Sequence, residues 1–173
     1  SAVLGHRCMC RFEVVTEISA GHTKITDDDL ELVSEFKDLE ILSLHNTKIS
    51  DAGLTRLRGL TRLRALILAK TRVTDVGMVN LQGLRELSLY QTDFSDQGME
   101  ALKSFDSLEE LALGQTQVSD EGLVHLQGLS KLKYLGLSSS NITDAGLTHL
   151  QGLTNLIQLN LADNQITGPG LVY

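Results

Sequence analysis

Aspartate residues recur along the chain at nearly constant intervals, and carboxylates are common ligands of hard cations. They are Asp27, Asp51, Asp75, Asp96, Asp120 and Asp144. A calcium loop gathers several oxygen ligands within one short segment, whereas these carboxylates are widely separated along the chain. Each aspartate follows a Ser or Thr and precedes an apolar, helix-like pattern, which is typical of a helix N-terminus. We interpret them as helix-start residues and predict no metal site.

Histidine and cysteine offer two further kinds of chemistry. His125 and His149 recur at the same spacing as the aspartates, but two imidazoles without a third ligand make a poor zinc site, and a solvated surface position is the simpler interpretation. Cys8 and Cys10 are two positions apart, so in an extended segment they point to opposite sides and are poorly placed to bridge each other. The sequence has no nucleophile elbow and no glycine-rich phosphate loop. It therefore predicts a protein without cofactors that is not an enzyme and that works in the reducing cytoplasm.

The even spacing of these residues reflects an internal repeat. A threonine marks the same point in most copies, and Ser140 and Asn164 take its place in the last two. These threonines are Thr23, Thr47, Thr71, Thr92 and Thr116. The steps between successive markers are equal, except for a shorter one between Thr71 and Thr92. A fixed period of this kind predicts a solenoid, in which each unit packs on its neighbours.

The repeat divides the chain into an N-terminal cap, residues 1–14, and seven units. The units are 15–38, 39–62, 63–83, 84–107, 108–131, 132–155 and 156–173, and the last of them is partial. The cap residues do not fit the repeat, but they carry enough apolar side chains to cover the first unit. No copy follows the last unit, so the sequence predicts an uncapped C-terminal end that invites self-association.

Each unit follows the pattern LxxLxLxxTxITDxGLxxLxGL, and its parts predict local structure. The LxL pair has period two, so both leucines point inward from a short strand, and successive strands stack into a parallel sheet. The Ser/Thr-Asp pair begins a short helix. Gly59, Gly83, Gly128 and Gly152 are predicted to end helices in the left-handed conformation. The third unit is three residues short, so we expect a tighter connection around Leu84.

This pattern resembles the leucine-rich repeat, and the resemblance covers residues 15–173. The ITDAGL segment is similar to the ribonuclease-inhibitor-like and cysteine-containing subclasses, the latter known from F-box substrate receptors. The length of the unit and its threonine look most like bacterial, planctomycete-type repeats. The resemblance implies an α/β solenoid with a curved parallel sheet on the concave face and short helices on the convex face.

Strand positions that the motif leaves free should line the concave face. Most of them hold small residues. The exceptions are His45, Ile67, Lys70, Tyr90 and Tyr134. Tyrosine combines a large contact area with one polar group and is common at binding hot spots, although it also simply suits β structure. We predict these five residues as the partner-binding set.

Charge is spread unevenly around the net value of −7, because residues 55–85 carry seven basic side chains and one acidic side chain. The basic patch comprises Arg56, Arg58, Arg62, Arg64, Arg72 and Arg85, with Lys70 among them. An acidic protein or a nucleic acid are the functional interpretations. The negative total charge and the absence of interleaved aromatic residues argue against nucleic acid. Internal pairing, such as Arg64 or Arg85 with Glu86, is the simpler interpretation.

The sequence favours a non-catalytic protein–protein interaction scaffold that binds another protein through its concave face. One alternative is a substrate-receptor or regulatory module of a larger enzyme, such as a ubiquitin ligase or a kinase. Another is a ligand- or glycan-binding repeat domain, which would call for more aromatic side chains. No apolar run approaches the roughly 20 residues that cross a bilayer, so we predict no membrane span.

Overall fold

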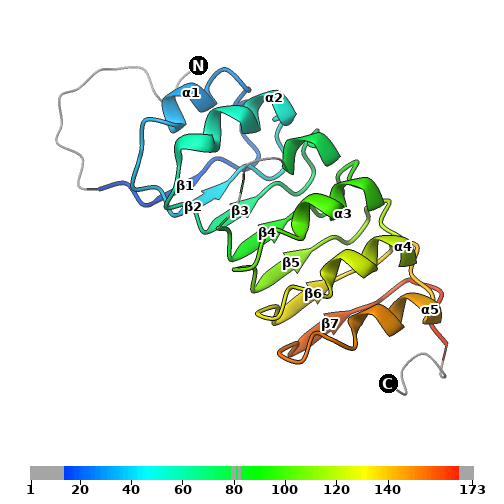
Figure 1. Cartoon of the computed structure of the whole chain (residues 1–173). Coiled ribbons are helices and arrows are strands. Elements are labelled where there is room, and N and C mark those ends of the chain that lie inside the picture. Colours follow the sequence, from blue (N-terminus) through cyan, green and yellow to red (C-terminus); the bar gives the residue numbers. More distant parts are fainter. Residues whose placement is uncertain (1–13, 79–80, 82, 168–173) are drawn as a thin grey trace.

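The computed structural model describes residues 14–78, 81 and 83–167, and these form an open sheet with short helices on one side (Figure 1). Seven parallel strands follow one another in chain order, from β1 to β7. They are β1 (Glu17–Ser19), β2 (Ile41–Ser43), β3 (Ala65–Ile67), β4 (Glu86–Ser88), β5 (Glu110–Ala112), β6 (Tyr134–Gly136) and β7 (Gln158–Asn160). This confirms the predicted solenoid, whose predicted cap lies outside the described residues except for Val14.

The strands stack in register, so residues at the same position of successive repeats are neighbours. Leu42 pairs with Leu66, and Leu66 pairs with Leu87. The register continues through the shortened third unit, where Ala65 pairs with Glu86. The missing residues are therefore accommodated on the helix side and leave the sheet unbroken.

The helix side consists of short segments, several of them 3₁₀ helices. The α-helices are α1 (Leu30–Val33), α2 (Asp51–Leu54), α3 (Asp96–Leu102), α4 (Asp120–Leu123) and α5 (Asp144–Leu147). The 3₁₀ segments are η1 (Thr55–Gly59), η2 (Asp75–Met78), η3 (Val124–Leu126) and η4 (Thr148–Leu150). Ser50, Ser95, Ser119 and Thr143 are the N-caps of α2 to α5, and each accepts the backbone N–H two residues later. The N-cap prediction is confirmed for these four helices, but it is wrong for Asp27, because α1 begins at Leu30 and its N-cap residue is Asp29.

The core lies between these two layers and consists mainly of leucine. The inward strand leucines, such as Leu42 and Leu44, are completely buried against helix residues such as Leu54 and Leu57. The repeated threonine closes each strand end, because its hydroxyl donates to the carbonyl three residues earlier, as Thr47 does to Leu44 at 2.7 Å. Asn164 performs the same task with its amide, which donates to Leu161 at 3.1 Å and to Leu137 of the preceding unit at 2.7 Å.

The repeated aspartates join each unit to the next one. Asp96 accepts the backbone N–H of Ser119 at 2.8 Å and its hydroxyl at 2.5 Å. The same pair of bonds connects Asp27 to Ser50, Asp51 to Thr74, Asp75 to Ser95, Asp120 to Thr143 and Asp144 to Thr167. We call this row the aspartate ladder. The ladder therefore does more than favour helix starts, since Asp27, Asp75, Asp96 and Asp120 each hold the N-cap residue of one of the helices α2 to α5.

The glycine of the Asp-x-Gly-Leu segment makes room for this ladder. A Cβ atom at Gly122 would come within 2.3 Å of Asp96 Oδ1, and one at Gly98 within 2.4 Å of Asp75 Oδ1. The requirement is steric, because these helical glycines have no positive φ. The aspartate of one unit can therefore make its hydrogen bonds only because the next unit has a glycine beside it.

The predicted helix-ending glycines differ from one another. Gly83 adopts a positive φ of 91°, as predicted, whereas Gly59, Gly128 and Gly152 do not, so the prediction is wrong for those three. The left-handed conformation instead occurs before the repeated threonine, where the chain leaves each strand. The residues there are His22, Asn46, Lys70, Gln91, Gln115, Ser139 and Asp163.

Candidate partner-binding surfaces

The concave face presents four of the five predicted partner-binding residues. Ile67 and Tyr134 belong to strands, and His45 and Tyr90 follow two positions after one, all four partly exposed. Lys70 is exposed but lies in the turn beyond β3, where its φ is 57°. The positions stack from repeat to repeat, so these side chains share one side of the sheet without forming a single cluster.

The three predicted aromatic or imidazole side chains each lie over a glycine. A Cβ atom at Gly21 would come within 2.0 Å of the His45 ring, one at Gly136 within 2.8 Å of Tyr134 Oη, and one at Gly114 within 3.1 Å of Tyr90 Cδ2. Each ring therefore lies against the sheet in space that a larger neighbour would fill. The contacts of His45 with Gly21 and of Tyr90 with Gly114 join neighbouring repeats and become visible only in the fold, whereas Tyr134 and Gly136 both belong to β6.

His45 belongs to a small polar cluster at the N-terminal end of this face. Its ring meets the ring of His22 edge to face, with centroids 4.7 Å apart, and its Nδ1 lies 2.9 Å from the Ser43 hydroxyl. The Asn46 amide contacts His22 Nδ1 at 2.7 Å. These contacts orient both imidazole rings. The described residues contain no group of three His, Cys, Asp or Glu side chains able to hold a metal ion.

Two stacked glutamates follow on the same face. Glu86 and Glu110 are register partners on β4 and β5. Burial, together with the charge of Glu110, raises the pKa of Glu86. A shallow groove of about 280 Å³ runs beside them and is lined by Glu40, Ile41, Arg64, Ala65, Arg85, Glu86, Glu109 and Glu110. This part of the surface carries both acidic and basic side chains.

The basic patch is largely neutralised within the molecule. Arg56 pairs with Asp28 at 2.9 Å and with Glu31, and Arg62 pairs with Asp38 at 2.5 Å. Within residues 14–78, 81 and 83–167, no ion pair is found for Arg58 or Arg72. Internal pairing therefore accounts for most of this patch.

The predicted pairing of Arg64 or Arg85 with Glu86 is wrong. Arg64 approaches Glu40 at 3.5 Å, and Arg85 approaches Glu109 at 3.6 Å. In-register stacking places the residue before each strand beside its equivalent in the next repeat, and Glu86 is one position further along. Lys133 continues this row by pairing with Glu109 at 2.6 Å, which lowers the pKa of Glu109.

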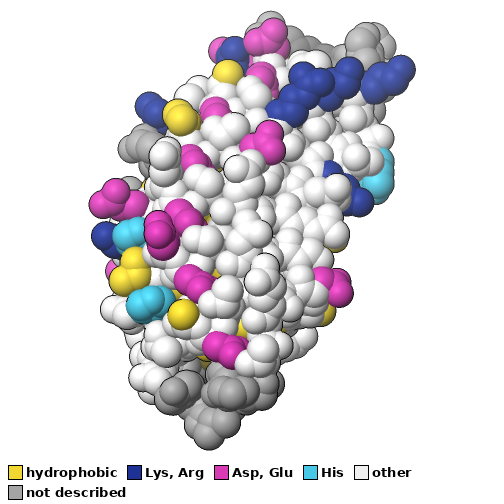
Figure 2. Space-filling model, turned by 90° about the vertical axis from the view of Figure 1, so that its right-hand side faces the viewer, with side chains coloured by type: hydrophobic (Ala, Val, Ile, Leu, Met, Phe, Trp, Pro, Cys, Tyr) yellow, Lys and Arg dark blue, Asp and Glu magenta, His cyan; other side chains and the backbone are white. Residues whose placement is uncertain are grey.

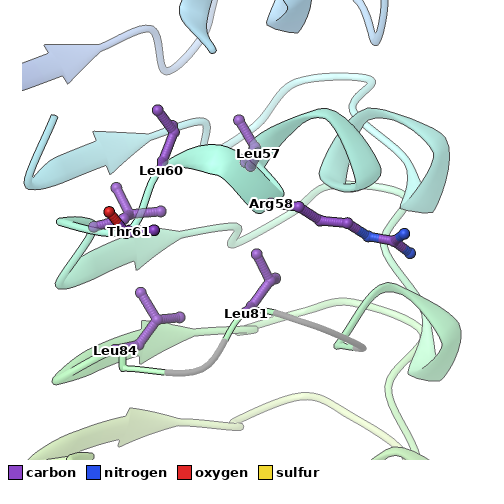
Figure 3. Close-up of a pocket in the computed structure, with 7 residues that line it drawn as sticks. Leu57, Arg58, Leu60, Thr61, Leu81 and Leu84 are labelled. Carbon is purple, nitrogen blue, oxygen red and sulfur yellow. The ribbon is translucent and has the colours of Figure 1, made fainter. Parts of the chain in front are cut away.

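The shortened third unit leaves a hollow of about 200 Å³ on the helix side. It is lined by Leu57, Arg58, Leu60, Thr61, Leu63, Leu81 and Leu84. Figure 3 shows Leu57 and Leu60 of the second unit across from Leu81 of the third unit and Leu84, the first residue of the fourth, while the Arg58 side chain extends away from them. Leu84 alone stands where the preceding connection has both Leu60 and Leu63, so the hollow is the space of a missing side chain.

His125 differs from its predicted role as a solvated surface residue. It is partly buried, and its Nδ1 atom is buried without a hydrogen-bond partner among the described residues. His149 occupies the same position one repeat later and is also partly buried.

The described part of the chain has no helix that is long and apolar enough to span a membrane.

Known proteins share this architecture. A family model described as Leucine Rich repeat matches residues 128–150 and 152–173. The chain is a leucine-rich repeat protein. No curated protein matches its sequence. The repeat family and the fold predicted from the motif are confirmed, while the ribonuclease-inhibitor-like, cysteine-containing or planctomycete-type subclass stays a prediction.

Two solved structures are similar to this leucine-rich repeat protein. An internalin (inlF) from Listeria monocytogenes has 27% sequence identity and a TM-score of 0.69, over 90% of this chain and 50% of that one. An internalin C2 (inlC2) from the same species has 27% identity and a TM-score of 0.70, over 91% of this chain and 76% of that one. This chain thus spans half of the length of the first of them. The likeness supports a repeat scaffold for protein interaction.

Proposed function

We propose that the chain is a non-catalytic scaffold that binds another protein through its concave face. The observation that supports this most directly is the set of three rings that lie over glycines, His45, Tyr90 and Tyr134, on a face where most other positions hold small side chains. A ring already held in place loses little conformational freedom when a partner covers it. Tyrosine also brings a large contact area and one hydroxyl, as binding hot spots commonly do.

The test compares partner capture by the native chain and by a variant with Tyr90→Ala and Tyr134→Ala. Loss of one hot-spot side chain of about 2 kcal/mol weakens binding about thirtyfold, so the double variant should bind more weakly than the native chain by more than that factor. The matched control carries His125→Ala and His149→Ala, which remove two rings from the opposite, convex side. Equal capture of the same partner by the native chain and the tyrosine variant would contradict the proposal.

A second candidate is a substrate-receptor or regulatory module within a longer protein. The supporting observation is that the chain spans 50% of the internalin inlF chain. The complete coding sequence tests it: a kinase domain or a ubiquitin-ligase adaptor segment in the same reading frame would support it, and its absence would remove it. We also propose cytoplasmic localisation, which cell fractionation tests, and self-association through the last strand.

A further inference from the structure

A row of cations follows the repeated threonine in the first three units. The residues at this position are Lys24, Lys48 and Arg72, and all three are exposed. The same position holds Asp93, Gln117, Asn141 and Gln165 in the later units. Lys70, in the left-handed turn just before Thr71, is also exposed. We call Lys24, Lys48, Lys70 and Arg72 the basic stripe.

The fold places these cations beside one another. The Arg72 backbone bridges to Ser50, and its N–H donates to the Ile49 carbonyl at 2.9 Å, so Arg72 lies along the segment that begins with Lys48. The register partner of Arg72 is Ser50, two positions after Lys48, so Arg72 and Lys48 lie near each other without being directly opposite. Exposed cations close together repel one another, and an anion laid across the stripe would relieve that repulsion.

The stripe differs from the rest of the basic patch, whose arginines mostly have acidic partners. Within the described residues, no ion pair joins Lys24, Lys48, Lys70 or Arg72 to a carboxylate. The aspartate ladder runs nearby, but Asp27 and Asp51 already accept two hydrogen bonds each from the next unit. Figure 2 views this edge of the solenoid and shows dark blue side chains gathered towards one end, apart from a column of acidic ones.

We infer that the basic stripe binds a short acidic segment of a protein partner. Three successive repeats at about 4.8 Å each span about 10 Å, and carboxylates on alternate residues of an extended peptide are about 6.6–6.8 Å apart, so two or three of them match the length of the stripe. A longer polyanion such as nucleic acid would run on past Arg72 to Asp93, into a region, 86–173, with three basic and eleven acidic side chains. This surface lies at the strand ends, and the inference does not depend on the tyrosines of the concave face.

The experiment measures the affinity of the full chain for a fluorescently labelled peptide of alternating Glu and Ser. Native binding should weaken as salt is added, because exposed charges are screened. The variant Lys48→Glu with Arg72→Glu should bind about tenfold or more weakly, and Lys48→Gln with Arg72→Gln should fall in between. The control, Lys103→Glu with Lys131→Glu, makes the same change in net charge away from the stripe and should keep native affinity. A further control, Tyr134→Ala, should also leave peptide binding unchanged.

Three outcomes would overturn the inference. The first is equal peptide affinity of the native chain and the Lys48→Glu, Arg72→Glu variant with unchanged circular dichroism. The second is equal weakening by the Lys103→Glu, Lys131→Glu control, which would indicate a bulk-charge effect. The third is that a single-stranded oligonucleotide of equal charge binds the native chain more tightly than the peptide does and loses this binding in the Lys48→Glu, Arg72→Glu variant. That result would assign the stripe to nucleic acid. Loss of peptide binding with retained partner capture would separate this inference from the concave-face proposal.

Discussion

The aspartate of each repeat is the side chain with the most demanding surroundings. Asp96 accepts an N–H and an O–H from Ser119 of the next unit, while Ser119 accepts the N–H of Glu121. A charged acceptor with two donors is among the stronger hydrogen-bonding arrangements. Ser119 in turn caps α4, so one carboxylate connects the ends of two successive helices.

Asp96→Asn should destabilise the chain by about 2 kcal/mol, because an amide offers one acceptor oxygen where Ser119 presents two donors. Urea unfolding followed by circular dichroism measures the change. Asp93→Asn is the matched control, since Asp93 is exposed and should tolerate the change within about 0.5 kcal/mol. Equal destabilisation by both substitutions would show that the ladder contributes little.

Glu86→Gln should stabilise the chain at neutral pH. Burial and the charge of Glu110 raise the pKa of Glu86 above its ordinary value of 4.5, so the folded chain binds that proton more tightly than the unfolded chain. The contribution of Glu86 to stability is therefore greatest below pH 4.5 and is lost as the pH rises through the folded pKa.

Thermal melts of the native chain and the Glu86→Gln variant at about pH 4 and about pH 7 test this prediction. The gain in melting temperature should appear at the higher pH and shrink at the lower one. Glu17→Gln is the control, since Glu17 holds the same strand position beside Ile41 instead of a second glutamate. A gain that is the same at both pH values, or the same in the control, would contradict the electrostatic cause.

At the scale of elements, the helix side is where the repeat varies. The α-helices of four residues in α1, α2, α4 and α5 contrast with the seven residues of α3. The strands keep one length and one register throughout. A parallel ladder requires equivalent hydrogen bonds at every step, whereas the helix layer can change length as long as its apolar side chains fill the gap.

Gly83 is the element-scale position where a side chain should cost most in backbone strain. Gly83→Ala should destabilise the chain by about 1 kcal/mol, because Gly83 has a φ of 91° in the shortened unit. Gly128→Ala is the matched control, since Gly128 lacks a positive φ and a Cβ atom there would meet no atom within 4 Å. The control should be neutral or slightly stabilising in urea unfolding. Equal behaviour of the two variants would refute the strain argument.

At the scale of the whole molecule, the sheet and the helix layer enclose one continuous core, and β7 is the last strand of that sheet. Leu159 is 37% exposed, whereas its register partner Leu135 on β6 is completely buried, and Ile157 just before β7 is 82% exposed. Each interior strand is covered by its successor, and β7 has none within the described residues. This strand therefore presents both apolar side chains and backbone groups for pairing.

We expect the chain to self-associate through β7 as concentration rises. Two copies of β7 related by a two-fold axis would pair antiparallel and cover the exposed Ile157 and Leu159 side chains. Light scattering should show dimers for the native chain and a shift towards monomer for Ile157→Lys. A monomer at high concentration in the native chain would contradict the expectation, and so would a dimer that Ile157→Lys leaves intact.

Periodicity and capping are local properties, so the repeat, the order of strands and helices and the leucine core could all be predicted from the amino-acid sequence. It also located His45, Ile67, Lys70, Tyr90 and Tyr134 at their positions in the repeat. Only the tertiary structure decided which residues of successive units meet. Stacking in register paired Arg64 with Glu40 and Asp96 with Ser119, and it placed Tyr90 over Gly114. These contacts join positions about one repeat apart, and a local pattern contains no information on how far each side chain reaches across that step.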